Sequence, residues 1–114
     1  MEGVSYFTAA ELEGLDSALV KGLLVAREVA NVPFVITSGR RTVAENTAAG
    51  GVRDSSHERG LAVDLACTDA RARYRILKGL FAAGFHRIGA YDLHVHADVD
   101  VSLPAEVVWL GVSH

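Results

Sequence analysis

The segment 93–100 constrains the fold of this chain more than any other part of its sequence. It reads Leu-His-Val-His-Ala-Asp-Val-Asp, so apolar and polar residues alternate. Because successive residues of a β-strand point to opposite faces of its sheet, this pattern predicts a strand over 94–101 with one face on a hydrophobic core. The core face would carry Val95, Ala97, Val99 and Val101, and the opposite face would carry His94, His96, Asp98 and Asp100.

Helix caps and apolar runs predict the remaining elements. We expect one helix that begins at Thr8, one over 17–30, one from Thr42 to Gly50 and one from Thr68 to about Ala83. A last helical turn is expected from Pro104 to near Trp109. The other expected strands are 34–37, 61–66 and 86–88. Since helices and strands mix without regular alternation, we expect one α+β domain over residues 1–114, with a small, largely antiparallel sheet flanked by helices.

Apolar side chains mark the faces by which the two longer helices would meet the core. In the helix over 17–30 these are Leu19, Leu23, Leu24, Ala26 and Ala30. In the helix over 68–83 they are Tyr74, Leu77, Leu80 and Phe81. The second helix also carries a basic cluster at helical spacing, which is typical of a solvated face: Arg71, Arg73, Arg75 and Lys78.

Length and charge exclude several classes of protein. With 114 residues the chain has room for one domain with a modest core, and we expect a monomer. Its formal net charge of −3 disfavours a nucleic-acid partner, which needs a clustered basic face. No apolar run has the length of a membrane span, so we expect no membrane insertion.

The lone cysteine and the first residues bear on the compartment. Cys67 is the only cysteine, so no internal disulfide can form, and we interpret it as a small core residue. The first residues lack the basic and apolar regions of a secretory signal. We therefore expect a protein that is made in the cytoplasm.

A second polar segment, 55–64, reads Ser-Ser-His-Glu-Arg-Gly-Leu-Ala-Val-Asp. His57 would lie at the end of a loop, and Asp64 would project from an otherwise apolar strand. An ionised carboxylate in such a place is unfavourable unless it is paired, hydrogen-bonded or bound to a metal. Gly60 would allow a sharp turn of the backbone, so that the side chains of His57 and Asp64 converge.

Imidazoles and carboxylates from these two segments could form a metal site. Two imidazoles and one carboxylate suit tetrahedral zinc and leave one position for water, whose pKa zinc lowers to about 7. Each part alone has a plainer interpretation, since a His-x-His pair is often partly exposed and an aspartate after an apolar run is often a strand-end cap. Their joint occurrence favours the metal site. His86 and His114 lack such neighbours, and we interpret them as structural or exposed.

Four segments together resemble a known family. In chain order they are Ser38-Gly39-Arg40-Arg41-Thr42, Gly50-Gly51, the segment 55–64, and His94-Val95-His96-Ala97-Asp98. They resemble the zinc D-Ala-D-Ala carboxypeptidase and L-Ala-D-Glu endopeptidase family, which shares one structural superfamily with lysostaphin-type peptidases and the hedgehog signalling domain. The resemblance runs from Phe34 to Trp109. It implies a hedgehog-like fold and hydrolysis of a peptide bond in bacterial peptidoglycan, with the enzyme acting at the cell wall after release or delivery, as phage and prophage lysis enzymes do.

The resemblance also implies roles for single residues. One zinc ion per chain would be bound by His57, Asp64 and His96. His94 would be the catalytic base and acid, and Arg41 would hold the carbonyl or carboxylate of the substrate.

Three further positions match residues near the site of relatives. Ser55 and Asp98 would support the ligands, and Trp109 would contact the substrate. This chain departs from the family in two places: relatives commonly have a tyrosine where Arg40 stands, and some place an acidic base where Leu93 stands. His94 must then act as the base, with Asp92 as the second choice.

The alternative to an enzyme is a zinc-stabilised binding module of the same fold that no longer cuts, as the hedgehog resemblance allows. The presence of His94 and Arg41 beside the three ligands favours the enzyme, because a structural zinc needs neither. A metal-free structural domain would leave the polar face of the strand over 94–101 unexplained.

Overall fold

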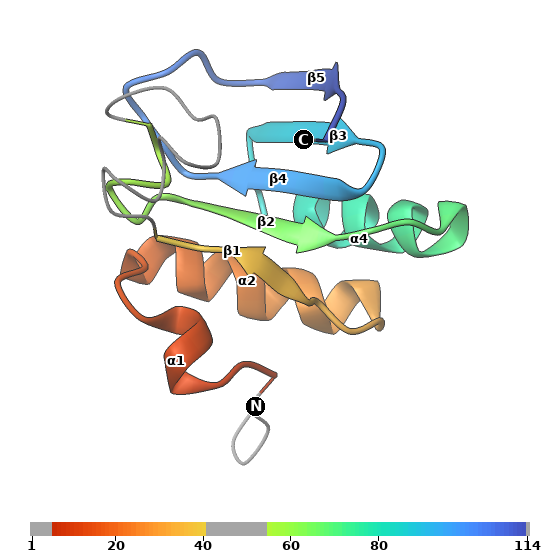
Figure 1. Ribbon diagram of the computed structural model, residues 1–114, viewed down its shortest axis with the longest axis horizontal. Helices are drawn as coiled ribbons and strands as arrows, with labels where there is room; N and C mark the ends of the chain where they lie inside the picture. Colours follow the sequence, from red (N-terminus) through yellow and green to blue (C-terminus); the bar gives the residue numbers. More distant parts are fainter. Residues whose placement is uncertain (1–5, 41–54, 114) are drawn as a thin grey trace.

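The computed structural model describes residues 6–40 and 55–113. Within them, a five-stranded sheet in the order β1-β2-β4-β3-β5 has helices packed against one face (Figure 1). The strands are β1 (Ile36–Ser38), β2 (Ala62–Ala66), β3 (Arg87–Tyr91), β4 (His94–Asp98) and β5 (Val107–Gly111). The helices are α1 (Ala9–Leu12), α2 (Ser17–Ala30) and α4 (Ala70–Ala82). Every neighbouring pair is antiparallel except β3 and β5, which confirms the expected α+β fold with a largely antiparallel sheet.

Helix α2 spans the residues that the sequence predicts. Its N-cap is Asp16, whose carboxylate accepts the backbone N–H of Ala18 at 2.9 Å, and it ends at Asn31 in the left-handed conformation with φ 54°. The predicted stripe is buried at Leu19, Leu23, Ala26 and Ala30. The prediction was wrong for Leu24, which is 39% exposed. Leu24 lies one residue beyond the centre of the stripe, and one residue rotates a side chain by about 100° around the helix axis.

Helix α4 packs inward through part of the predicted face, because Leu80 is fully buried and Leu77 packs against the core. Ile76, Gly79 and Leu80 are buried, whereas Tyr74 and Phe81 are 70% and 54% exposed, so their predicted inward orientation was wrong. Tyr74 precedes Ile76 by two residues and so points to the opposite side of the helix.

A small residue is required where the two helices meet. A Cβ atom on Gly79 would lie 2.3 Å from the carbonyl oxygen of Ala26, so only glycine permits this approach of α4 to α2. The apolar face of the sheet completes this core with Val63, Leu65, Ile88, Val95 and Ala97. Cys67 is also buried, as predicted, and His86 is exposed.

Strand β4 is shorter than the predicted strand over 94–101. It ends at Asp98, and Val101 is 99% exposed, so its place on the core face was wrong. The chain bends because the buried carboxylate of Asp100 is bonded to the loop before β2. It accepts the hydroxyl of Ser56 at 2.7 Å and pairs with the guanidinium of Arg59.

The last predicted helical turn, from Pro104 to near Trp109, is instead strand β5. Val107 and Trp109 are half-buried, while Val108 and Leu110 are 53% and 85% exposed, and this period of two is that of a strand. The backbone of β5 pairs in parallel with β3, a long-range interaction that outweighs the helix-start signal of a proline. The predicted helix from Thr42 to Gly50 lies outside the described residues. Among the residues that are described, no helix is long and apolar enough to cross a membrane.

The Asp100 contacts yield a prediction for stability. Burial alone would raise the pKa of Asp100, but hydrogen bonds from Ser102, Ser56 and Arg59 outweigh it and hold this pKa below its ordinary value. A carboxyl group whose pKa is lowered by folding stabilises the protein above its unfolded pKa and loses that contribution as the pH falls. Asp100→Asn should therefore reduce the free energy of unfolding at pH 7 by about 1–3 kcal/mol, measured by denaturant unfolding.

The difference between Asp100→Asn and the parent should be complete above about pH 5 and should shrink as the pH falls below about 4. Glu106→Gln, at another acidic position of the same connection between β4 and β5, serves as the control. A difference that stays constant from neutral to acid pH would show that the charge of Asp100 contributes nothing to stability.

Candidate metal centre

A tight turn brings His57 to the sheet. The backbone N–H of Gly60 donates to the carbonyl of His57 at 3.2 Å, and that of Leu61 donates to the carbonyl of Ser56 at 2.9 Å. Gly60 has φ 72°, and a Cβ atom there would lie 2.1 Å from the carbonyl oxygen of Gly14. Only glycine fits this backbone conformation and this approach, as the sequence predicts.

The pairing of β2 with β4 brings the other two residues together. Asp64 on β2 lies directly opposite His96 on β4 in this antiparallel pair. Directly opposed residues project from the same face of a sheet, so their side chains meet on the face away from α2 and α4. Asp64 is 8% exposed and His57 is 6% exposed, which shields the cluster from water.

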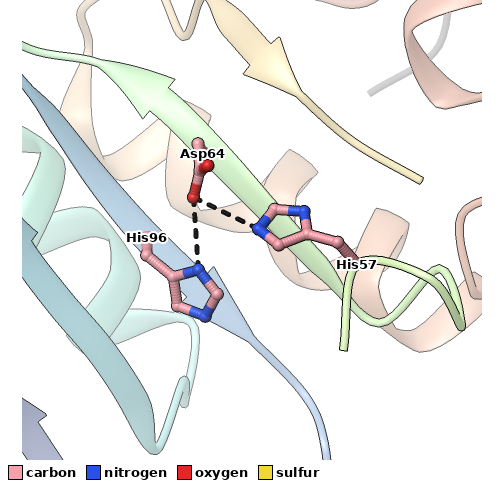
Figure 2. Close-up of side chains that lie close together, drawn as sticks. All are labelled: His57, Asp64 and His96. Carbon is pink, nitrogen blue, oxygen red and sulfur yellow. Dashed lines mark hydrogen bonds and ion pairs between the residues drawn. The ribbon is translucent and has the colours of Figure 1, made fainter. Parts of the chain in front are cut away.

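Figure 2 shows the imidazoles of His57 and His96 turned toward one oxygen of Asp64. His57 Nε2 lies 3.4 Å from Asp64 Oδ1, and His96 Nδ1 lies 3.2 Å from the same oxygen. One ligand atom from each of the three residues lies within 4.8 Å of the other two. The structure thus brings together the three residues that the family resemblance implies as ligands.

Each imidazole has a hydrogen bond on the side away from Asp64, and this bond determines which of its nitrogens faces Asp64 with a lone pair. His57 Nδ1 lies 2.9 Å from the carbonyl oxygen of Gly39, which can only accept, so Nδ1 carries the proton and Nε2 faces Asp64 with its lone pair. His96 Nε2 lies 2.7 Å from Asp98 Oδ2, so Nε2 donates to this carboxylate and the lone pair of neutral His96 is at Nδ1. Two lone pairs and a carboxylate therefore converge, and such a set of acceptors fits a divalent metal ion with a position left open.

Charges within the cluster shift the pKa values of Asp64 and His96 in opposite directions. Burial alone would raise the pKa of Asp64, but the hydrogen bonds and charges of His57 and His96 outweigh it and hold this pKa below its ordinary value. Burial alone would lower the pKa of His96, but Asp64 and Asp98 outweigh it and raise this pKa. A proton on His96 relieves the repulsion among the converging acceptors, and a metal cation at the same point does so too.

Asp98 holds His96 in place by accepting a hydrogen bond from its Nε2. Its side chain is 1% exposed, and besides His96 it accepts Arg87 Nε at 2.9 Å and the backbone N–H of Asp100 at 3.1 Å. The structure therefore places Asp98 where the resemblance implies support for a ligand. Arg87 was not predicted from the sequence, because no spacing rule links it to the site before the pairing of β3 with β4 is known.

Ser56, the residue after Ser55, connects the turn of His57 to the end of β4. Ser55 is half-buried, and its carbonyl accepts the backbone N–H of Glu58 at 3.0 Å within the turn. Ser56 is buried and donates its hydroxyl to Asp100, which ties the turn of His57 to the end of β4. No sequence signal separates the roles of these adjacent serines.

His94 lies beside the cluster and outside the group of converging ligand atoms. Its Nε2 is 3.9 Å from Asp64 Oδ1, and its ring stacks on Tyr91 with centroids 4.2 Å apart and an angle of 13°. Burial is the main cause that lowers the pKa of His94, and the charge of Asp64 opposes it only in part. Its assignment as the catalytic base remains a prediction.

Trp109 borders the same face from β5. Its ring centroid lies 5.3 Å from that of His96, and its Nε1 donates to the hydroxyl of Tyr91 at 3.0 Å. Tyr91 thus joins the site unpredicted, because its role depends on the pairing of β5 with β3. Arg41, the expected substrate-binding residue, lies outside the described residues, and the neighbouring Arg40 is exposed.

Comparisons with known proteins place these features in a family. The family model described as Peptidase M15 matches residues 2–100. Among solved structures, the crystal structure of the Serratia marcescens L-Ala D-Glu endopeptidase ChiX is similar in fold, with a TM-score of 0.61 and 20% sequence identity over 84% of this chain and 90% of that chain. No curated protein matches the sequence significantly.

The converging ligand atoms predict tight binding of one divalent metal ion per chain. His57→Ala, Asp64→Ala and His96→Ala should each remove it, because each variant deletes one of the three protein ligands. Metal content by mass spectrometry of the desalted protein measures this loss. His86→Ala, which removes an exposed histidine, is the matched control and should keep its metal. A ligand variant with full metal content would contradict the assignment of that residue.

Proposed function

This chain is a member of the peptidase M15 family of peptidases, and we propose that it is a zinc-dependent peptidase of bacterial peptidoglycan. Its substrate would be a stem peptide, cut either as an L-Ala-D-Glu endopeptidase or as a D-Ala-D-Ala carboxypeptidase cuts. The observation that carries the proposal is the convergence of His57 Nε2, His96 Nδ1 and the Asp64 carboxylate, with His94 turned toward the same carboxylate from outside the ligand set.

Zinc is the metal that best matches this set of donors. Two imidazole nitrogens and one carboxylate oxygen are typical ligands of catalytic zinc, which keeps a fourth position open. Zinc held by His57, Asp64 and His96 would polarise the carbonyl of the peptide bond and acidify the attacking water.

The residues of the chain itself would bind the peptide and move the proton. His94 Nε2, which lies 3.9 Å from Asp64 Oδ1, would accept a proton from the attacking water and return it to the leaving nitrogen. Because burial lowers the pKa of His94, its imidazole is neutral at pH 7, as a base must be. We propose two contacts to the substrate. The ring of Trp109 would pack against it as an apolar surface, and the guanidinium of Arg41 would bind its carbonyl or carboxylate.

The proposed activity can be tested on purified peptidoglycan. The protein with zinc should release stem-peptide fragments that mass spectrometry identifies, and the mass of the fragments gives the bond. A chelator should abolish the release, and added zinc should restore it. Release that continues in the chelator would contradict zinc dependence. A zinc-loaded protein that releases nothing would contradict the enzymatic function and favour a binding module.

His94→Ala tests the base. This variant should keep its zinc and melt near the temperature of the parent, because His94 is not among the converging ligands. Its kcat should fall by about a hundred- to ten-thousand-fold, the usual effect of losing a general base. His86→Ala again serves as the matched control. Loss of zinc from His94→Ala would make His94 a ligand, and an unchanged kcat would place the base elsewhere.

A further inference from the structure

Ser113 contacts the proposed base from a part of the chain that the family model does not match. The match covers residues 2–100, and Ser113 follows strand β5. Its Oγ lies 2.8 Å from His94 Nδ1 and accepts the backbone N–H of Leu93 at 3.2 Å. Its backbone N–H donates to Asp92 Oδ1 at 2.5 Å. Ser113, two residues after the end of β5, is thus bonded to Asp92, Leu93 and His94, the last of which begins β4.

The contacts of Ser113 provide a hydrogen-bond acceptor for one tautomer of His94. Asp92 Oδ1 accepts the backbone N–H of Ser113, which holds Ser113 Oγ 2.8 Å from His94 Nδ1. A serine oxygen has two acceptor sites, and the backbone N–H of Leu93 uses one of them. The other site can accept a proton carried by His94 Nδ1.

In the tautomer with a proton on Nδ1, the other nitrogen of His94 has its lone pair on the side of the metal site. His94 Nε2 is the atom that lies 3.9 Å from Asp64 Oδ1. Tyr91 stacks on one face of the His94 ring, and the bond from Trp109 Nε1 to the Tyr91 hydroxyl holds Tyr91 in place. The ring is therefore held both at its edge and on its face.

The turn that carries Asp92 is itself fixed to a helix. Arg73 on α4 donates to the backbone carbonyls of Tyr91 at 2.6 Å and Asp92 at 3.0 Å, and to that of Cys67 at 3.1 Å. These bonds correct the interpretation of Arg73 as part of a solvated face. They hold the turn between β3 and β4, so that Asp92 and Ser113 form a rigid support for His94.

We propose that Ser113 and Asp92 are positioning residues that hold His94 in the Nδ1–H tautomer, with the lone pair of Nε2 turned toward His57, Asp64 and His96. The consequence for catalysis rests on the proposed function, in which His94 Nε2 is the base. The same bonds remove Asp92 as the second choice for the base, because its carboxylate faces Ser113. An aspartate and a serine thus orient this histidine, as a carboxylate does in other catalytic sites.

The tautomer can be measured without any activity. In the zinc-loaded, nitrogen-15-labelled protein, long-range proton–nitrogen spectra should show His94 with a protonated Nδ1 and an unprotonated Nε2, assigned by comparison with His94→Ala. Ser113→Ala should lose this pattern, and Ser113→Thr, which keeps the hydroxyl, should restore it. Ser17→Ala, at an exposed serine of α2, is the matched control. A parent His94 with its proton on Nε2 would overturn the proposal.

Kinetics then test whether the support acts through His94. Ser113→Ala should lower kcat by about ten- to a hundred-fold, with little change in KM or zinc content, and Ser113→Thr should recover most of it. In the His94→Ala background the same substitution should have no further effect. A further loss in that background, or a parental kcat in Ser113→Ala, would overturn the proposal. If the spectra agree but the parent cuts no stem peptide, the proposed function fails while the positioning of His94 is upheld.

Discussion

The buried carboxylate of Asp64 is the interaction on which the rest of this structure depends. It projects from a central strand whose neighbouring side chains, Val63 and Leu65, are fully buried in the core. A negative charge in such a place needs compensation, and the chain supplies it with His57 from the turn and His96 from the adjacent strand. Each imidazole is fixed by its outer nitrogen, so its inner nitrogen has no freedom to turn away. The site is therefore preorganised for a cation.

Much of the fold follows from local patterns in the sequence. Helix α2 and strand β2 were predicted nearly to the residue, and strand β4 was predicted at its first residue, because caps and hydrophobic periodicity are encoded within each segment. The errors occur where contacts between distant segments determine the local structure. Strand β5 exists through its pairing with β3, and the exposed Tyr74 and Phe81 reflect the face that α4 presents to α2. No pattern within those segments contains this information.

The residues of the candidate site also divide into those that local patterns predict and those that distant contacts bring in. The three converging residues could be predicted, because a histidine, a turn glycine and an aspartate at the right spacing, followed by His-x-His, form a recognisable pattern. The supports could not be predicted, since they depend on the register of strands far apart in the chain. Arg87 reaches Asp98 across one strand pair, and Ser113 reaches His94 from beyond β5. A sequence thus shows which groups do chemistry more readily than which groups orient them.

The most direct measurement of the central claim is the position of the metal in a crystal of the zinc-loaded protein, located by anomalous scattering at the zinc edge. We expect one peak about 2.0–2.2 Å from His57 Nε2, His96 Nδ1 and an oxygen of Asp64, with His94 Nε2 beyond bonding distance. A zinc ion bound elsewhere, or one that takes His94 as a fourth protein ligand, would contradict the assignment of this site as an open catalytic centre.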